Sequence, residues 1–205
     1  MTVIVDYGVG NLFSLKSSLD YLGEDGIVSG DENIIRSADR IILPGVGAFA
    51  DAKKKLSSNS LDKVVVEEAK KCKPLMGICL GMQLLFEKSY EFGATEGLSL
   101  IAGEVKPIAP VIPKGYKVPH IGWNSLHFTG KGRNSEVFKY IAEGEFVYFV
   151  HSFAAMGCED SVTAFAEYGA DLTAAVQRGN VFGMQFHPEK SGETGLRILK
   201  AFCEL

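Results

Sequence analysis

The chain has 205 residues, of which 46% are hydrophobic and 22% charged, and its formal net charge is −4. This composition is close to the globular average and excludes global disorder, and the length suits one α/β domain spanning residues 1–205. The slightly acidic balance disfavours a protein that binds nucleic acid. The lack of any run of about 18 apolar residues predicts no membrane span.

The N-terminus and the cysteines favour a reducing compartment. Residues 1–6 enter a strand pattern at once and lack the zones of a signal peptide, so we expect a cytoplasmic protein. None of the four cysteines belongs to a C-x-x-C pair, which argues against a zinc ribbon or a redox dithiol, and we predict no metal site. Three of them, Cys72, Cys158 and Cys203, have no distinctive local context and are taken as structural.

The first half of the chain alternates short apolar strands with helical patterns. Strands are predicted at residues 3–5, 40–43 and 75–78, and helices at 11–22, 48–56 and 61–72, with a further helix starting at residue 80. Asn11 is expected to cap the first helix. This alternation predicts an α/β fold in which helices cover both faces of a doubly wound, mostly parallel sheet.

The second half reads as extra strands between glycine-rich turns, followed by one helix. Strands are predicted at residues 104–109, 118–122, 146–150, 162–167, 174–177 and 181–185, and the last helix at 193–202. We expect the extra strands to be antiparallel. A Gly8-Val9-Gly10 turn follows the first strand, but Phe13 stands where a dinucleotide fingerprint needs its third glycine, so no cofactor is predicted.

The sharpest local signal is Gly77-Ile78-Cys79-Leu80-Gly81, which has the form G-x-nucleophile-x-G between a strand and a helix. Glycines relieve the crowding of such a sharp turn. The turn leaves Cys79 at a helix N-terminus, which favours a thiolate, and the N–H of Leu80 is available to an oxyanion. Until a base is found, a small buried cysteine is the plain alternative.

A base and its orienter are predicted at His187-Pro188-Glu189, which follows the last strand. Alternation along an extended chain puts positions 187 and 189 on one side, and Pro188 favours that geometry. Glu189 then holds the tautomer of His187 in which the other nitrogen accepts the proton of Cys79. Both corners lie beyond the carboxyl ends of strands, where open α/β sheets place their sites.

These residues resemble those of class I (triad) glutamine amidotransferases, whose fold is flavodoxin-like. The resemblance covers nearly the whole chain. Four further motifs resemble the glutaminase subunits of imidazole glycerol phosphate synthases, namely residues 6–12 (DYGVGNL), 44–49 (PGVGAF), 118–124 (VPHIGWN) and 147–152 (VYFVHS). After VHS many relatives have Tyr where this chain has Phe153, so Phe153 receives no polar role.

The resemblance implies hydrolysis of L-glutamine to glutamate and ammonia through a γ-glutamyl thioester. In it, Cys79 is the nucleophile, His187 the acid and base, and Glu189 the orienter. By the same resemblance the oxyanion hole is formed at Val46, Gly47 and Leu80, and the substrate is bound by Gln83, Glu91 and Ser152.

The resemblance also implies a partner, a (β/α)8-barrel cyclase that takes up the ammonia in histidine biosynthesis and forms a heterodimer with this chain. The interface would use Asn11, His120, Trp123, Asn124, Tyr148 and Lys190. The isolated chain is expected to be nearly inactive, because the segment 44–47 must rearrange when the partner binds.

Three other functions stay open from the sequence. The chain could supply ammonia to a different synthase, act as a cysteine peptidase or deglycase, or be a binding module with a vestigial triad. The first would lead to another product, the second would act without glutamine, and the third would carry an unreactive Cys79.

Overall fold

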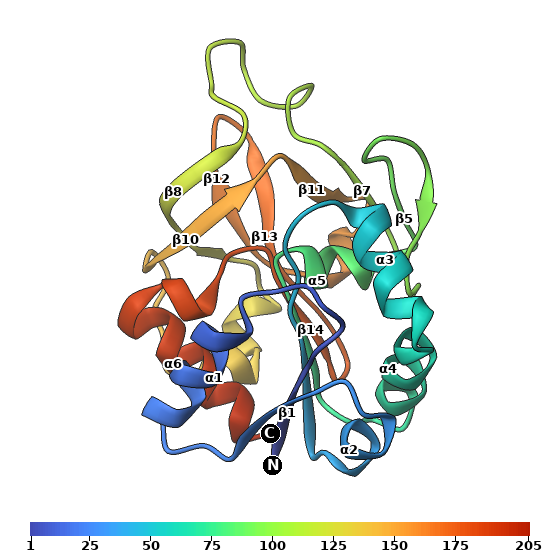
Figure 1. Ribbon diagram of the computed structural model, residues 1–205. Coiled ribbons are helices and arrows are strands. Elements are labelled where there is room, and N and C mark those ends of the chain that lie inside the picture. The colour runs from blue at the N-terminus through green and yellow to red at the C-terminus, as the bar shows by residue number, and fades with distance from the viewer.

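The computed structural model describes residues 1–205, and a central eight-stranded sheet organises them (Figure 1). Its order is β2-β1-β3-β4-β14-β13-β12-β9. In this order the first five strands run parallel and the last three pair antiparallel. The second half of the chain supplies the antiparallel strands, as expected, but its strand β14 pairs parallel with β4. The strands are β1 (Thr2–Val5), β2 (Gly26–Ser29), β3 (Arg40–Leu43), β4 (Leu75–Ile78), β9 (His127–Phe128), β12 (Val162–Glu167), β13 (Asp171–Arg178) and β14 (Val181–Met184).

Helices cover both faces of this sheet. On one face lie α1 (Leu12–Tyr21) and α6 (Gly192–Cys203), and on the other α2 (Glu32–Ser37), α3 (Phe49–Ser58), α4 (Leu61–Lys70) and the short α5 (Leu80–Leu84) (Figure 1). Two buried apolar clusters fill the two layers, and β1 contributes Val3 and Val5 to one cluster and Ile4 to the other. The predicted α/β fold is therefore confirmed. None of the helices combines the length and apolar character needed to cross a membrane.

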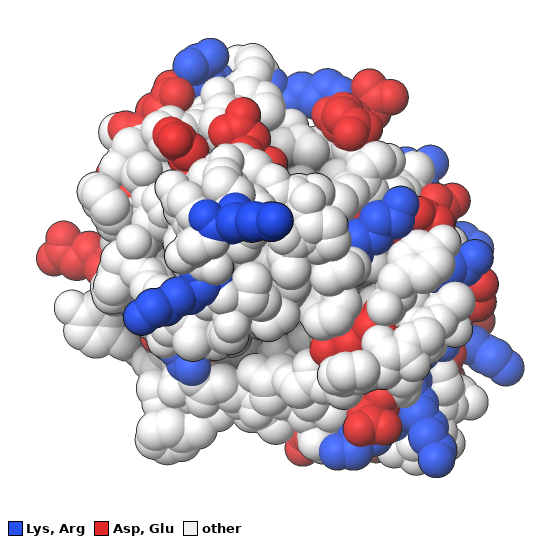
Figure 2. Space-filling view, turned by 90° about the horizontal axis from the view of Figure 1, so that it is seen from above, with Lys and Arg blue, Asp and Glu red and all other residues white.

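Two smaller sheets lie above the carboxyl ends of the parallel strands (Figure 1). One pairs β8 (His120–Ser125) with β10 (Phe146–His151), and the other joins β11 (Phe153–Met156), β7 (Glu104–Pro107), β5 (Lys88–Ser89) and β6 (Thr95–Glu96). Figure 2 looks down on this end of the molecule. A broad uncharged area, crossed by a few basic side chains, lies there between groups of acidic ones.

The structure corrects several local predictions. Asn11 precedes α1, but its side chain makes no capping hydrogen bond. A cap is found instead at Asp31, whose carboxylate accepts from the N–H groups of Asn33 and Ile34 at the start of α2. The sequence missed both β2 and α2, because each is too short to show a period. The strand expected at residues 118–122 is displaced and forms β8.

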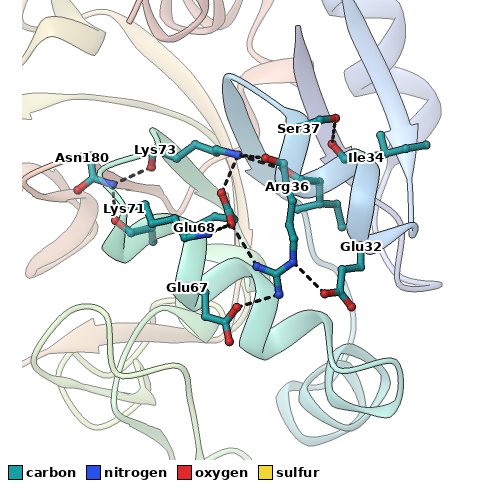
Figure 3. Close-up of polar contacts among 11 residues, drawn as sticks. Glu32, Ile34, Arg36, Ser37, Glu67, Glu68, Lys71, Lys73 and Asn180 are labelled. Carbon is teal, nitrogen blue, oxygen red and sulfur yellow. Dashed lines mark hydrogen bonds and ion pairs between the residues drawn. The ribbon is translucent and has the colours of Figure 1, made fainter.

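A buried carboxylate ties α2 to α4 (Figure 3). The side chain of Glu68 is 4% exposed and accepts from Arg36, Lys71 and Lys73 at 3.2, 2.7 and 2.8 Å. Burial opposes its charge, but the two lysines outweigh burial and lower the pKa of Glu68 to about 2. The neighbouring Glu67 contacts only Arg36, at 2.8 Å, and is 53% exposed. Glu68 is therefore the carboxylate on which this part of the fold depends.

Candidate active site

Cys79 occupies a strained turn between β4 and α5. Its φ of 54° and ψ of −113° are unusual for a residue with a Cβ. The turn needs glycine at two positions. A Cβ on Gly81 would stand 1.9 Å from the carbonyl oxygen of Leu43, and one on Gly77 would stand 2.6 Å from that of Gly81. The G-x-C-x-G segment thus has the strand–turn–helix setting that its spacing predicts.

His187 and Glu189 meet just beyond β14. The Nδ1 of His187 lies 2.8 Å from Oε1 of Glu189, and their side chains are 2% and 1% exposed. The expected extended chain is wrong, since residues Pro188–Lys190 form one turn of 3-10 helix, η4. A proline at the first helical position favours such a turn, and the carbonyl of His187 accepts from the hydroxyl of Ser191 and the N–H of Lys190.

The surroundings of His187 favour its charged form. Burial alone disfavours an imidazolium, but the adjacent Cys79 and Glu189 outweigh burial and raise the pKa of His187 to about 9. Because Nδ1 is engaged by the carboxylate, the remaining nitrogen is Nε2, which is buried and makes no hydrogen bond. The ring thus keeps one nitrogen available for proton exchange.

Cys79 and His187 line a common cavity of about 290 Å³ at the carboxyl ends of the parallel strands. Every residue predicted for glutamine or oxyanion binding also contributes to its wall. The lining residues are Val46, Gly47, Cys79, Leu80, Gln83, Glu91, Pro119, Val150, His151, Ser152, Phe153 and His187. Glu189 stands behind the imidazole and completes the arrangement without lining the cavity.

Two glutamine side chains brace the cysteine side of this cavity. The amide nitrogen of Gln83 donates to the carbonyl of Phe153 at 3.1 Å and to Oε1 of Gln185 at 3.0 Å. In turn, the Nε2 of Gln185 lies 3.8 Å from the sulfur of Cys79. Gln185 is fully buried and was missed by the sequence reasoning. The available signal was its place two residues before His187 at the end of β14, where alternate residues share a side.

One of the predicted oxyanion donors, the N–H of Leu80, is occupied in this conformation. The N–H of Leu80 donates to the carbonyl of Gly45 at 3.3 Å. Gly45 lies so close to α5 that a Cβ on it would stand 2.6 Å from the backbone nitrogen of Gly81. The next residues, Val46 and Gly47, are exposed at the cavity mouth, and Gly47 has a φ of 92°. Segment 44–47 therefore has to turn before Leu80 can donate to a ligand.

Glu91 follows β5, and Ser152 stands between β10 and β11; both line the cavity. An oxygen of Glu91 accepts from the N–H of Phe49 at 2.6 Å, at the start of α3. This contact fixes the carboxylate beside the cavity and leaves its other oxygen without a recorded partner. The carbonyl of Ser152 accepts from the N–H of Ile108, which anchors that part of the wall.

Most of the residues predicted for an interface are at least partly exposed, but His120 is buried. Trp123 is 55% exposed and meets Tyr148 edge to face at 6.2 Å, with the amine of Lys190 6.0 Å from the same tyrosine ring. Asn11 and Asn124 are half-buried. His120 departs from the expectation, because its ring is only 3% exposed and stacks between Phe149 and Tyr168, so it presents no surface of its own.

Comparison with known proteins assigns this arrangement to a family. Residues 3–204 match the family described as glutamine amidotransferase class-I. The chain therefore belongs to the class I glutamine amidotransferases. Solved structures with the same fold include a glutamine amidotransferase (TM-score 0.75, 20% identity, 98% of this chain and 97% of that one) and PurLQS from Thermotoga maritima (TM-score 0.76, 20% identity, 99% and 97%).

Full-length relatives narrow the assignment. The chain is 48% identical over 206 residues to the imidazole glycerol phosphate synthase subunit HisH of Caldanaerobacter subterraneus, with 100% of this chain and 98% of the relative covered. Identity to the HisH subunit of Oceanobacillus iheyensis is also 48%, with 100% and 99% covered, and to that of Wolinella succinogenes it is 46%, with 100% of both. Within the amidotransferases, the chain is a member of the HisH group.

Proposed function

We propose that the chain, acting as one amidotransferase domain, hydrolyses L-glutamine to glutamate and ammonia with Cys79, His187 and Glu189 as a triad. The observation that carries this proposal is the shared cavity of Cys79 and His187, with Glu189 2.8 Å from the far nitrogen of the imidazole. Membership of the class I glutamine amidotransferases supports glutamine as the substrate.

In the proposed reaction the proton of Cys79 passes to Nε2 of His187, and the sulfur attacks the side-chain carboxamide carbon of glutamine. The carbon–nitrogen bond then breaks, ammonia leaves with a proton from Nε2 of His187, and a γ-glutamyl thioester forms. The same nitrogen next takes a proton from water, whose oxygen attacks the thioester. The carbon–sulfur bond breaks, glutamate leaves, and Nε2 returns the proton to the sulfur of Cys79. Glu189 holds the tautomer that keeps Nε2 directed at the reacting atoms and stabilises the imidazolium.

The oxyanion of each tetrahedral intermediate would be bound by the N–H groups of Val46 and Leu80, beside Gly47. That role requires the carbonyl of Gly45 to leave the N–H of Leu80, which it now occupies at 3.3 Å. Glycine at 45 and 47 lets the intervening peptides turn at low cost. The proposal therefore includes a resting state of low activity, from which binding of a partner releases the segment 44–47.

We assign the two ends of the glutamine substrate to different parts of the cavity wall. Gln83 and the backbone around Ser152 would hold the amide end and chain of glutamine. Glu91 would pair with its ammonium group, because its carboxylate lines the cavity and uses one oxygen on α3. A carboxylate and an ammonium at such a wall form a charge-assisted contact.

The ammonia acceptor is proposed to be a (β/α)8-barrel cyclase, bound as a heterodimer through the end of the molecule shown in Figure 2. The relatives' printed name describes a subunit of imidazole glycerol phosphate synthase, which supports a second subunit. Trp123, which is exposed, forms an aromatic pair with Tyr148, and the amine of Lys190 lies over the tyrosine ring. We assign Asn11 and Asn124 to the same contact. Exposed tryptophan and tyrosine are common interface anchors.

The test is glutamate release with and without a cyclase subunit, comparing Cys79→Ala with Cys158→Ala. Cys158 is also buried but hydrogen-bonds Thr173 away from the cavity. We expect the first variant to lose all activity and the second to keep it. Glutaminase activity retained by Cys79→Ala in the assembled complex would refute the mechanism, and turnover of peptides or glycated adducts without glutamine would favour a different hydrolase.

A further inference from the structure

A continuous hydrogen-bond path runs from β8 to the cavity wall through two histidines. The Nδ1 of His120 lies 3.0 Å from Nε2 of His151. The Nδ1 of His151 lies 2.9 Å from the carbonyl oxygen of Phe153. That carbonyl also accepts from the amide of Gln83 at 3.1 Å, and both residues line the cavity beside Cys79.

The position of each proton on this path follows from its neighbour. A carbonyl only accepts, so Nδ1 of His151 carries the hydrogen. A neutral ring then accepts at Nε2, which makes His120 donate from its own Nδ1 and accept at Nε2. Asn124 stands at that end, with its amide nitrogen 3.4 Å from Nε2 of His120 and 2.8 Å from the carbonyl of Glu167. Each N–H donor on the path therefore faces an acceptor.

The surroundings keep both rings neutral, as this path requires. Burial lowers the pKa of His120 to about 4, and its ring is held between Phe149 and Tyr168 at centroid distances of 4.9 and 4.1 Å. Burial likewise lowers the pKa of His151 to about 4, with added repulsion from His120 and His187. A charge on either ring would leave two N–H groups facing each other.

We propose that His151 and His120 are positioning residues of the glutamine site, a relay of two neutral rings that fixes the Phe153 carbonyl and the Gln83 amide and extends that hold to Asn124 on β8. The proposal rests on the glutaminase function above and assigns the path a task within it. The bond from His151 to the Phe153 carbonyl fixes the part of the cavity wall that glutamine would contact. At the other end of the path, His120 and Asn124 belong to β8, the strand that carries Trp123.

Two substitutions at His151 separate the two bonds of its ring. Asparagine places an amide nitrogen near the former Nδ1 and keeps the donor to Phe153, whereas glutamine reaches the former Nε2 and keeps the contact with His120. When the donor at position 151 is lost, the carbonyl of Phe153 accepts only from the amide of Gln83. Since such a bond contributes about 1 kcal/mol, we expect His151→Gln to raise KM for glutamine about fivefold while kcat changes less than about twofold, and His151→Asn to keep KM.

The matched control is His127→Asn, which removes a half-buried histidine that stacks on Phe165 outside this path. KM is measured in the complex with the cyclase subunit. Absence of glutamate release by the unsubstituted chain would count against the proposed function, whereas equal KM values for the unsubstituted chain and His151→Gln would overturn the relay. A shared loss of thermal stability in both His151 variants without any difference in KM would also overturn it.

A second measurement needs neither activity nor substitution. Long-range proton–nitrogen NMR spectra of the histidine rings report which nitrogen carries the hydrogen. We expect His120 and His151 to be neutral at pH 7 and protonated on Nδ1, and His187 to be charged. An Nε2–H tautomer or a charged ring at either relay position would overturn the proposal.

Discussion

Replacement of Glu189 by glutamine tests the electrostatic basis of the triad. The rise in the pKa of His187 from 6.5 to about 9 corresponds to roughly 3 kcal/mol of added stability for the imidazolium, since each pKa unit is worth about 1.4 kcal/mol. This free energy is the net of the opposing effect of burial and the favourable contributions of Cys79 and Glu189. If Glu189 supplies about half, Glu189→Gln lowers the pKa of His187 to between about 7 and 8.

Two assays follow this change. An NMR titration of the His187 ring gives its pKa directly. Glutamate release in the presence of the cyclase subunit is expected to fall about 10²-fold or more, because the glutamine side chain no longer favours the required tautomer or charge. Glu193→Gln is the matched control, since Glu193 is exposed on α6 and makes no recorded side-chain contact. A pKa that stays near 9 in Glu189→Gln would refute the reasoning.

The same pair predicts a pH dependence of stability. A histidine whose pKa is raised on folding contributes fully below its unfolded pKa of 6.5 and loses that contribution as the pH rises through about 9. Chemical denaturation should therefore separate the unsubstituted chain from Glu189→Gln more at pH 6 than at pH 10. A gap that is constant or widens with pH would contradict the pairing of His187 with Glu189.

Three further outcomes are expected. Glu68→Gln should lower the free energy of unfolding by about 2 kcal/mol, a value discounted because the cations in Figure 3 are partly exposed. The control Glu67→Gln should lower it by no more than about 0.5 kcal/mol. Equal losses of the two variants in urea denaturation would contradict the buried network. Gly81→Ala should prevent correct folding, because its Cβ would stand 1.9 Å from a backbone oxygen, whereas Gly130→Ala, with open space around it, should fold normally by circular dichroism. Trp123→Ala should weaken cyclase binding at least about tenfold in calorimetry without changing the fold, and unchanged affinity would remove Trp123 from the interface.

Local sequence determined the reactive corner of this protein. The glycines around Cys79 are required by backbone contacts that any such strand–turn–helix corner makes, so the spacing G-x-C-x-G carries the geometry within itself. The His187-Pro188-Glu189 segment likewise joins its imidazole and carboxylate over two residues, although by a 3-10 turn and not by an extended chain. The alternation of strands and helices was also enough for the fold class.

Tertiary structure decided the features that depend on residues far apart in the chain. The bond between Leu80 and the Gly45 carbonyl, the bracing of Cys79 by Gln185 and the burial of His120 all arise where separate segments meet. Short elements such as β2 and α2 form because neighbouring strands and α4 supply their contacts, not because their own sequences have a strong period. A local pattern can encode a turn, but whether a donor is free, occupied or buried is set by the segment packed against it.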